Sequence, residues 1–212
     1  MQVLKTEVRS KILQEAEQVF YDKGYANASM REIATRAGVT VGNIYRYYKN
    51  KDALFSAIVD DTYMKLMDIV DMEILDHYGF SEEGYGVLKQ TIITKVMEIL
   101  QKNRLVTMIL LEGSNGTRYE NFKEAYIDLI EKQYMPPVLN KVMEKGIDID
   151  TALFSKIIAR GCFEAMVEVT RTFSTPSDLE KHLNWAMDFY LYSIIDRFKQ
   201  ADKQADNQKE AR

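Results

Sequence analysis

Apolar residues recur at steps of three and four along most of the chain. In residues 6–23 this spacing links Ile12, Ala16, Val19 and Phe20, which indicates a helix with one buried face. Gly24 follows this segment and predicts that the helix ends there. The same period predicts further helices over about 29–37, 41–47, 51–75, 81–102, 104–112, 118–135, 150–172 and 177–199. Pro136 and Pro137 predict an interruption or kink, with a new helix running from there to Gly146. The pattern predicts an all-α fold.

Polar residues stand where the second, third and fourth helices are expected to begin. Ser29 and Glu32 form a capping box, and Thr40 and Asn50 are the caps expected for the next two helices. Gly38 predicts a sharp turn between the second and third helices. Segment 29–48 therefore has the spacing of a helix-turn-helix, in which the second helix enters the major groove of DNA.

The third helix has an inward and an outward face. Ile44 and Tyr48 share the side expected in the core. Gly42 has no side chain to hold DNA away, and Thr40 with the free N–H groups at the helix start suits a phosphate oxygen. The residues expected to face outward or lie at the edges are Val41, Asn43, Tyr45, Arg46 and Tyr47. Next to them, Lys49 and Lys51 are predicted to clamp phosphates.

Charge is unevenly distributed along the 212 residues. The whole chain carries a formal charge of −4, but residues 1–55 hold nine cations and six acidic residues, a net +3, so the remainder carries −7. A basic segment joined to an acidic one is expected of a polyanion-binding module attached to a domain with another role.

Composition excludes several classes of protein. Hydrophobic residues make up 46% of the chain, with only ten glycines and three prolines, which favours long helices. Cys162 alone cannot form an internal disulfide, and His77 and His182 cannot supply a metal site, so we expect no metal and no cofactor. No apolar run suffices to span a bilayer, and no basic-then-apolar leader opens the chain. We expect a cytoplasmic protein without a membrane partner.

The last two predicted helices, 150–172 and 177–199, are apolar over an unusually wide arc. One apolar face would suffice for packing within a subunit, so the excess predicts a homodimer formed by these helices. Residues 201–212 lack apolar anchors and are expected to form a polar, flexible tail.

A ligand pocket is predicted between the fourth helix and the helices near 104–130 and 150–172. Eleven methionines favour an adaptable apolar cavity, although each apolar candidate taken singly is better explained as plain core, and each polar candidate is explained equally well by surface exposure. The candidate apolar lining is Met64, Met67, Met108, Leu111, Tyr119, Phe122, Tyr126, Cys162, Phe163 and Met166. The candidate polar groups that would orient a ligand are Glu112, Asn115, Arg118 and Glu168.

The stretch SMREIATRAGVTVGNIYRYYKNKDALF, residues 29–55, resembles the DNA-binding signature of the TetR family of bacterial transcriptional regulators. The resemblance covers about the first 55 residues and departs at Tyr48, where phenylalanine is usual, so the Tyr48 hydroxyl needs a partner. It implies phosphate contacts from Ser29, Thr40, Tyr45 and Lys51. It further implies base or groove contacts from Arg31, Val41, Gly42, Asn43, Arg46 and Tyr47.

The resemblance implies a helical homodimer that binds a palindromic operator and is released by a small molecule. The expected organisation is a helix-turn-helix domain over 1–50, a long helix that leads into a ligand-binding and dimerisation domain over 51–200, and the tail. One alternative keeps the DNA binding but replaces the small molecule by a protein partner. An enzyme is disfavoured because the chain lacks a phosphate loop, HExxH and GxSxG, and pairs such as Glu112 with Glu164 or Glu168 arise by chance.

Overall fold

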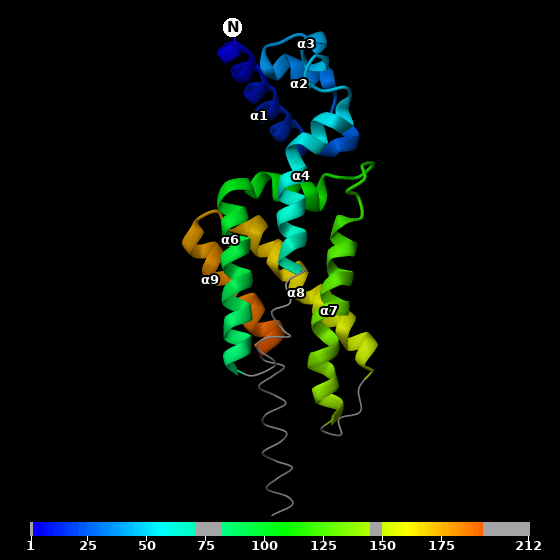
Figure 1. The fold of residues 1–212 in the computed structure, drawn as a ribbon, viewed down its shortest axis with the longest axis vertical. Coiled ribbons are helices and arrows are strands. Elements are labelled where there is room, and N and C mark those ends of the chain that lie inside the picture. The colour runs from blue at the N-terminus through cyan, green and yellow to red at the C-terminus, as the bar shows by residue number, and fades with distance from the viewer. Residues whose placement is uncertain (1, 71–81, 145–149, 193–212) are drawn as a thin grey trace, which may run out of the picture. The chain divides into compact units, whose positions relative to one another are not determined.

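The computed structural model describes residues 2–70, 82–144 and 150–192, and within these ranges every regular element is a helix (Figure 1). The all-α prediction is confirmed. The elements are α1 (Gln2–Asn27), α2 (Met30–Ala37), α3 (Val41–Tyr45), α4 (Lys51–Val70), α6 (Glu82–Glu112), α7 (Phe122–Glu144), α8 (Thr151–Thr172), α9 (Pro176–Met187) and a π-helix (Asp188–Tyr192).

The contacts divide the chain into two compact units. The first contains residues 1–67 and 99–123, and the second contains residues 68–98 and 124–212. The first unit thus combines α1 to α4 with the last part of α6 and the loop after it. The second unit contains the first part of α6 together with α7, α8, α9 and the π-helix.

The core of the first unit consists of the apolar face predicted for α1 and the aromatic residues that meet it. Ile12, Val19 and Phe20 have no exposed surface. The Phe20 and Phe55 rings meet edge to face with centroids 5.0 Å apart, and the Tyr25 and Phe55 centroids are 5.2 Å apart. Such aromatic pairs contribute beyond their buried area. They join α1 to the start of α4.

The predicted break between two helices near residue 103 is present. Of the interruption or kink predicted at the two prolines, the interruption is wrong and the kink stays a prediction. Asn103 leaves helical geometry inside α6, with φ −135° and ψ 31°. In contrast, α7 continues through Pro136 and Pro137 to Glu144. Each proline removes a backbone donor at a cost of about 3 kcal/mol. Burial of Met135 and Leu139, each 1% exposed, offsets part of this cost.

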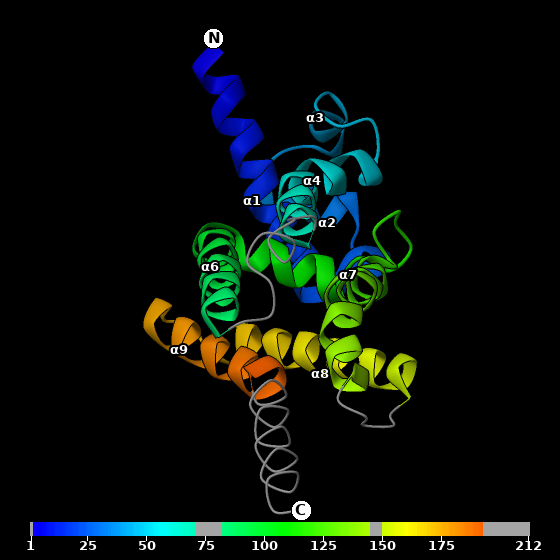
Figure 2. The same ribbon diagram turned by 60° about the horizontal axis from the view of Figure 1, so that its bottom comes forward.

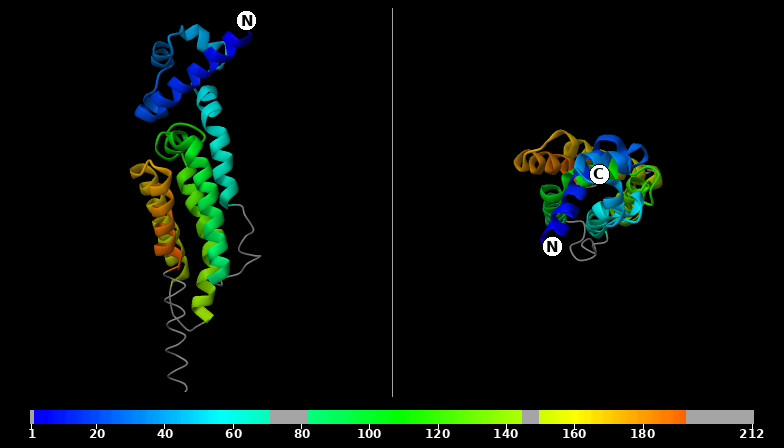
Figure 3. Two further views of the ribbon diagram at one scale, coloured as in Figure 1. Left: turned by 90° about the vertical axis from the view of Figure 1, so that its left-hand side faces the viewer. Right: turned by 90° about the horizontal axis from the view of Figure 1, so that it is seen from above.

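In the second unit, α8 and α9 lie side by side (Figures 2 and 3). α8 also packs closely against the π-helix at Gly161, where a Cβ atom would lie 2.5 Å from Cε1 of Tyr190. Only glycine leaves room for this ring. The carboxylate of Asp188 accepts hydrogen bonds from Tyr85 at 3.0 Å and from Lys89 at 2.9 Å, which ties α6 to the π-helix.

Some expectations lie outside the described residues. They are the end of the fourth helix beyond Val70, the last turns of the helix predicted to reach residue 199, and the polar tail over 201–212.

Candidate nucleic-acid interface

The helix-turn-helix predicted over residues 29–48 is formed by α2, a turn at Gly38 and α3. Ser29 Oγ accepts a hydrogen bond from the N–H of Glu32, and Thr40 Oγ1 accepts one from the N–H of Asn43, each 3.2 Å long. Gly38 adopts φ 66° and ψ 32°, the left-handed conformation that glycine tolerates best. The predicted caps and turn are confirmed, except that the Glu32 carboxylate pairs with Lys23 and Arg36 and does not complete the predicted capping box.

The capping hydrogen bonds leave part of the hydrogen-bonding capacity of the Ser29 and Thr40 hydroxyl groups unused. A serine or threonine hydroxyl carries one donor and two acceptor lone pairs, and each cap uses only a lone pair. The O–H of Ser29 and of Thr40 therefore remains able to donate to a phosphate oxygen. Both residues are exposed, so the local geometry that begins the helices is compatible with the contacts expected of them.

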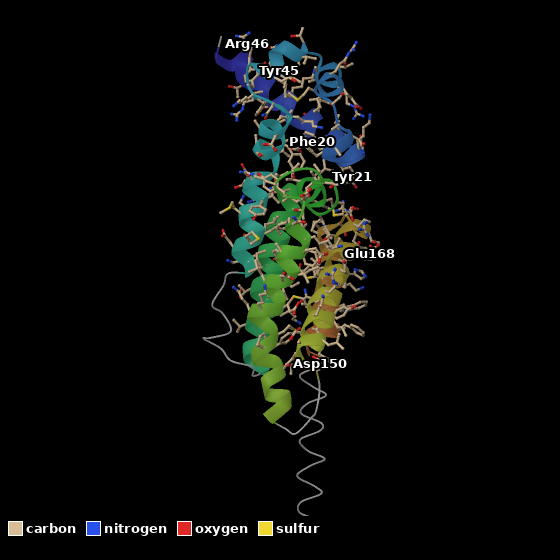
Figure 4. The ribbon with its side chains drawn as sticks, turned by 90° about the vertical axis from the view of Figure 1, so that its right-hand side faces the viewer. Phe20, Tyr21, Tyr45, Arg46, Asp150 and Glu168 are labelled. Atoms are coloured by element: carbon tan, nitrogen blue, oxygen red, sulfur yellow. The ribbon has the colours of Figure 1, made fainter. Side chains whose placement is uncertain are left out.

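The two faces of α3 differ as the periodicity predicted. Ile44 is fully buried and Tyr48 is 5% exposed, whereas Tyr45 is 50% exposed. Arg46 is also exposed, and Figure 4 places it with Tyr45 near α3, while Phe20 lies further along α1. Val41, Asn43 and Tyr47 are half-buried at the edges of the outer face.

Gly42 lies on the outer face of α3, where no packing contact within the protein requires a glycine. It is exposed, and a Cβ atom added to it would meet nothing within 4 Å. Glycine lowers helix stability by about 1 kcal/mol relative to alanine. A glycine here leaves the backbone of α3 open to close approach from outside.

Three of the candidate cations are available on this surface. Within the described residues, Arg31, Arg46 and Lys49 are exposed and form no ion pair. Arg36, by contrast, is held by Asp22 at 3.3 Å and by Glu32 at 3.5 Å. Asp22 and Glu32 therefore engage Arg36, which was not a candidate, and leave the three candidate cations without an ion pair.

Lys51 has partners that the sequence did not indicate. Its Nζ donates to the carbonyl oxygens of Tyr25 at 2.7 Å and Ala28 at 2.9 Å, and it lies 4.2 Å from the centroid of the Tyr25 ring. Burial lowers the pKa of the Lys51 ammonium. The Tyr25 carbonyl lies near the end of α1 and the Ala28 carbonyl lies between α1 and α2, so Lys51 ties the end of α1 to the start of α4. Its contact with phosphate remains a prediction.

The hydroxyl of Tyr48 has the partner that its burial requires. Arg9 Nε donates to Tyr48 Oη at 3.2 Å, across 39 residues of sequence. This hydrogen bond raises the pKa of the Arg9 guanidinium. Sequence reasoning counted Arg9 only in the total charge, because no periodic pattern links it to α3.

Comparison with protein families identifies the same region. The family model described as "Bacterial regulatory proteins, tetR family" matches residues 12–58, from α1 through α3 into α4. The chain belongs to the TetR family. It is a DNA-binding helix-turn-helix transcriptional regulator, as the resemblance at residues 29–55 implied.

Curated relatives of this TetR-family chain match stretches of different length. An uncharacterized HTH-type transcriptional regulator of Bacillus subtilis, YvdT, is 23% identical over 142 residues, which cover 65% of this chain and 71% of the relative. The HTH-type transcriptional regulator TtgR of Pseudomonas putida is 43% identical over 54 residues, which cover 26% of each chain. Similarity is therefore strongest over a segment about as long as the DNA-binding region.

A solved structure supports the TetR-family fold beyond that segment. NalD, the secondary repressor of the MexAB-OprM multidrug efflux pump in Pseudomonas aeruginosa, aligns with a TM-score of 0.51 and 19% identity. The alignment covers 86% of this chain and 94% of NalD. An N-terminal helix-turn-helix domain followed by a C-terminal helical domain is thus the architecture of this TetR-family member.

The candidate effector residues are divided between the two units. In the first unit Met108, Tyr119 and Phe122 are buried, Met67 and Leu111 are half-buried, and Met64 is 57% exposed. Glu112 and Asn115 are exposed there. The Tyr63 ring lies 5.4 Å from the rings of both Tyr119 and Phe122, so these aromatics form a packed cluster.

Two polar groups in the same unit have definite partners. Arg118 Nη2 lies 2.6 Å from Asp60 Oδ1, and it also donates to the hydroxyl of Tyr119. That hydroxyl contacts Asp60 and, at 3.2 Å, Ser56. Burial and the hydrogen bond to Asp60 raise the pKa of Tyr119. The group links α4 to the loop between α6 and α7.

In the second unit the candidates are more deeply packed. Tyr126, Cys162 and Phe163 are buried and Met166 is half-buried; the Tyr126 and Phe163 rings lie 5.3 Å apart. Glu168, the fourth polar candidate, is exposed and is labelled in Figure 4. Its carboxylate pairs with Arg171. A pocket that combines these residues with those of the first unit remains a prediction.

Membrane-spanning helices and metal-binding clusters are both absent from the described residues. None of the described helices is both long and apolar enough to cross a membrane. Across the same parts of the chain, no group of three or more histidine, cysteine, aspartate or glutamate residues is arranged as a metal site.

Proposed function

We propose that this regulator is a repressor that binds a palindromic operator as a homodimer and is released by a small, largely apolar effector. The observation that carries the proposal is a set of outward-facing apolar side chains on α8 and the α9 region. Their exposed fractions are 53% for Leu153, 43% for Phe154, 54% for Ile157, 61% for Trp185 and 69% for Phe189.

A second copy of the chain is the partner that this surface favours. Leu153, Phe154 and Ile157 stand three and four residues apart, so they line one side of α8, and α8 packs against α9. Exposed apolar patches of this kind mark interaction sites. A two-fold contact brings the same patch from both copies together, so α8 and α9 of each protomer bury one another in a four-helix interface.

The palindromic operator follows from this symmetry. Two recognition helices related by a two-fold axis meet the same base sequence on opposite strands, about 34–36 Å apart, one turn of B-DNA. In each half-site Ser29, Thr40, Tyr45 and Lys49 contact phosphates, and Lys51 is retained as a further candidate. Base or groove contacts come from Arg31, Val41, Gly42, Asn43, Arg46 and Tyr47.

An apolar effector suits the side chains assigned to its site. In each unit the candidate rings, Tyr119 and Phe122 in the first and Tyr126 and Phe163 in the second, offer apolar faces, and each tyrosine adds one hydroxyl group. The effector lowers operator affinity by preferring a state in which the recognition helices have another spacing. The repressor NalD, whose fold is similar, gives the direction of regulation by analogy alone.

Selection of DNA by the full-length protein tests the first part of the proposal. We expect a random duplex library to yield a sequence with two inverted half-sites, and sedimentation to give a dimer bound to it. A single, asymmetric half-site bound by a monomer would contradict the proposal.

A second experiment separates a small-molecule effector from a protein partner. A panel of apolar compounds is screened for those that raise the melting temperature and weaken operator binding together, which linkage requires of a true effector. If no compound does both, and a protein co-purified with this chain releases it from the operator, control by a protein partner replaces control by an effector.

A further inference from the structure

A guanidinium group from α1 is held at the end of the recognition helix. The Tyr48 ring is buried among the core residues, 5% exposed, and its hydroxyl accepts the hydrogen bond from Arg9 Nε at 3.2 Å. Arg9 itself is exposed. The core therefore fixes the ring, and the ring fixes one edge of an exposed cation.

The chemistry of arginine leaves a second edge available. A guanidinium has five N–H donors in a rigid planar fork, and Nε contributes only one of them. In the part of the chain that the structure describes, the Nη groups of Arg9 have no carboxylate partner. Two parallel N–H groups of this kind match the oxygen atoms of a phosphate.

The position of this cation relative to α3 suits the DNA backbone. Tyr48 follows α3 by only three residues, and Arg46 between them is exposed. The first half of α1 and α3 lie at the same end of the first unit (Figures 1 and 2). A helix in the major groove, which is about 12 Å wide, has a sugar-phosphate backbone on each side.

We propose that Arg9 is a further DNA-contacting residue that donates its Nη groups to a backbone phosphate, while Tyr48 acts as its positioning residue through Nε. The inference rests on the proposed insertion of α3 into the major groove. It assigns a role to the one departure from the family signature, because phenylalanine at position 48 could not accept this hydrogen bond.

Salt-dependent binding of four variants tests the inference. The probe is the duplex that the wild-type full-length protein selects, and the dissociation constant is measured between 50 and 300 mM KCl. The variants are Arg9→Gln, Tyr48→Phe, the double variant, and Lys65→Gln as a control. Lys65 is an exposed cation of α4 that pairs with Asp61.

We expect Arg9→Gln to reduce the slope of log K against log salt by about 0.9 per protomer, because one phosphate contact is lost. Mixed-sequence duplex should lose affinity similarly, since a phosphate contact carries no base information. Tyr48→Phe should weaken binding with a smaller change in slope, because the charge remains but is no longer held. In the Arg9→Gln background, Tyr48→Phe should have no further effect on binding.

Two results would overturn the inference alone. In one, the wild-type protein binds DNA, and Arg9→Gln lowers the melting temperature but leaves the slope of log K against log salt unchanged. The Arg9 contact would then be purely structural. The other is an equal loss of slope in Lys65→Gln, which would make the effect one of overall charge. A wild-type protein that selects no duplex would overturn the proposed function as well.

Discussion

The backbone N–H of Tyr25 donates a 2.7 Å hydrogen bond to the carbonyl oxygen of Gly113. Tyr25 lies near the end of α1, and Gly113 follows the last residue of α6, so the bond joins segments far apart in the sequence. The two backbones can approach because Gly24, next to Tyr25, and Gly113 itself both lack a side chain. A Cβ atom on Gly113 would lie 3.5 Å from Cα of Gly24. The helix-turn-helix and the end of α6 therefore belong to one compact unit.

Substitution of Gly113 by alanine should destabilise the first unit. The added Cβ would lie 3.1 Å from the carbonyl oxygen of Ile109 and 3.3 Å from that of Phe20. Both neighbours are backbone atoms and cannot move without shifting a helix, so we expect a loss of about 1–3 kcal/mol in the free energy of unfolding. Thermal or urea unfolding measures it.

Gly86→Ala is the matched control. Gly86 lies inside α6, and a Cβ there would meet nothing within 4 Å. Alanine should raise stability there by up to about 1 kcal/mol through its helix propensity. Equal effects of the two substitutions would contradict the close backbone contact at Gly113.

Gly42→Ala should separate stability from DNA binding. The space around this position is open, so alanine should leave the free energy of unfolding unchanged or raise it by about 0.5–1 kcal/mol. The methyl group should nevertheless weaken operator binding, because it holds the backbone of α3 away from DNA. Denaturation and fluorescence anisotropy on the same samples give both quantities. Undiminished operator affinity would remove Gly42 from the interface.

Lys51 and Lys49 should respond oppositely to replacement by methionine. Lys51→Met leaves the carbonyls of Tyr25 and Ala28 without their donor, so it should lower the free energy of unfolding by about 1–3 kcal/mol. It should change the salt dependence of DNA binding less than Lys49→Met does, because the Lys51 ammonium is already bound to two carbonyl oxygens. Lys49→Met, at an exposed position, should instead reduce the salt slope by about 0.9 per protomer and leave stability nearly unchanged.

The reverse outcome for Lys51 would restore the role that the sequence predicted for it. A reduced salt slope with unchanged stability would mean that its ammonium leaves the two carbonyls and binds phosphate when DNA is present.

Ile157→Glu should convert the proposed dimer into monomers. The side chain is 54% exposed in the single chain and would face its symmetry mate in the interface, where an unpaired carboxylate costs several kcal/mol. Analytical ultracentrifugation should then give the monomer mass, and operator affinity should fall at least about 100-fold with the loss of the second recognition helix. Lys156→Glu is the control, since it changes the charge of α8 by more. A dimer that survives Ile157→Glu would exclude this face as the interface.

Cys162 should make stability fall in alkaline solution. Burial raises the pKa of its thiol to about 12, whereas an unfolded thiol has a pKa of about 8.5. Above about pH 8.5 the unfolded chain releases a proton that the folded chain retains, so stability decreases as pH rises toward 12. The slope should approach about 1.4 kcal/mol per pH unit.

The matched variant for this effect is Cys162→Ala. It should be less stable near pH 7 because of the smaller side chain. Its stability should nevertheless depend less on pH between about 8.5 and 12, because it lacks the thiol. The tyrosines and lysines that titrate in this range are common to both proteins, so the difference between the two pH curves reports the thiol. Parallel pH curves for the two proteins would show that the thiol titrates alike in the folded and unfolded chains.

Local features of the helix-turn-helix were predictable because their causes are local. The caps at Ser29 and Thr40 are hydrogen bonds over three residues, and the turn at Gly38 depends on the conformational range of one glycine. The inward face of α3 followed from a period of 3.6 residues. Family resemblance at residues 29–55 then identified the function that this geometry serves.

Longer-range features did not follow from the pattern. Pro136 and Pro137 predicted an interruption from their local cost, but the buried neighbours Met135 and Leu139 belong to a continuous α7. Lys51 carries a charge that the sequence assigned to DNA, yet folding puts carbonyl oxygens within its reach. Periodicity reports which side of a helix is buried and not what lies against it.

Sequence alone thus established an all-α chain, its helix starts and a DNA-binding signature, since each depends on neighbours within one or two helical turns. Tertiary structure decided which distant groups meet: Arg9 with Tyr48, Lys51 with Tyr25, and Tyr25 with Gly113. Such pairs form when separate helices pack, so their partners are set by the shape of the core and not by spacing along the chain.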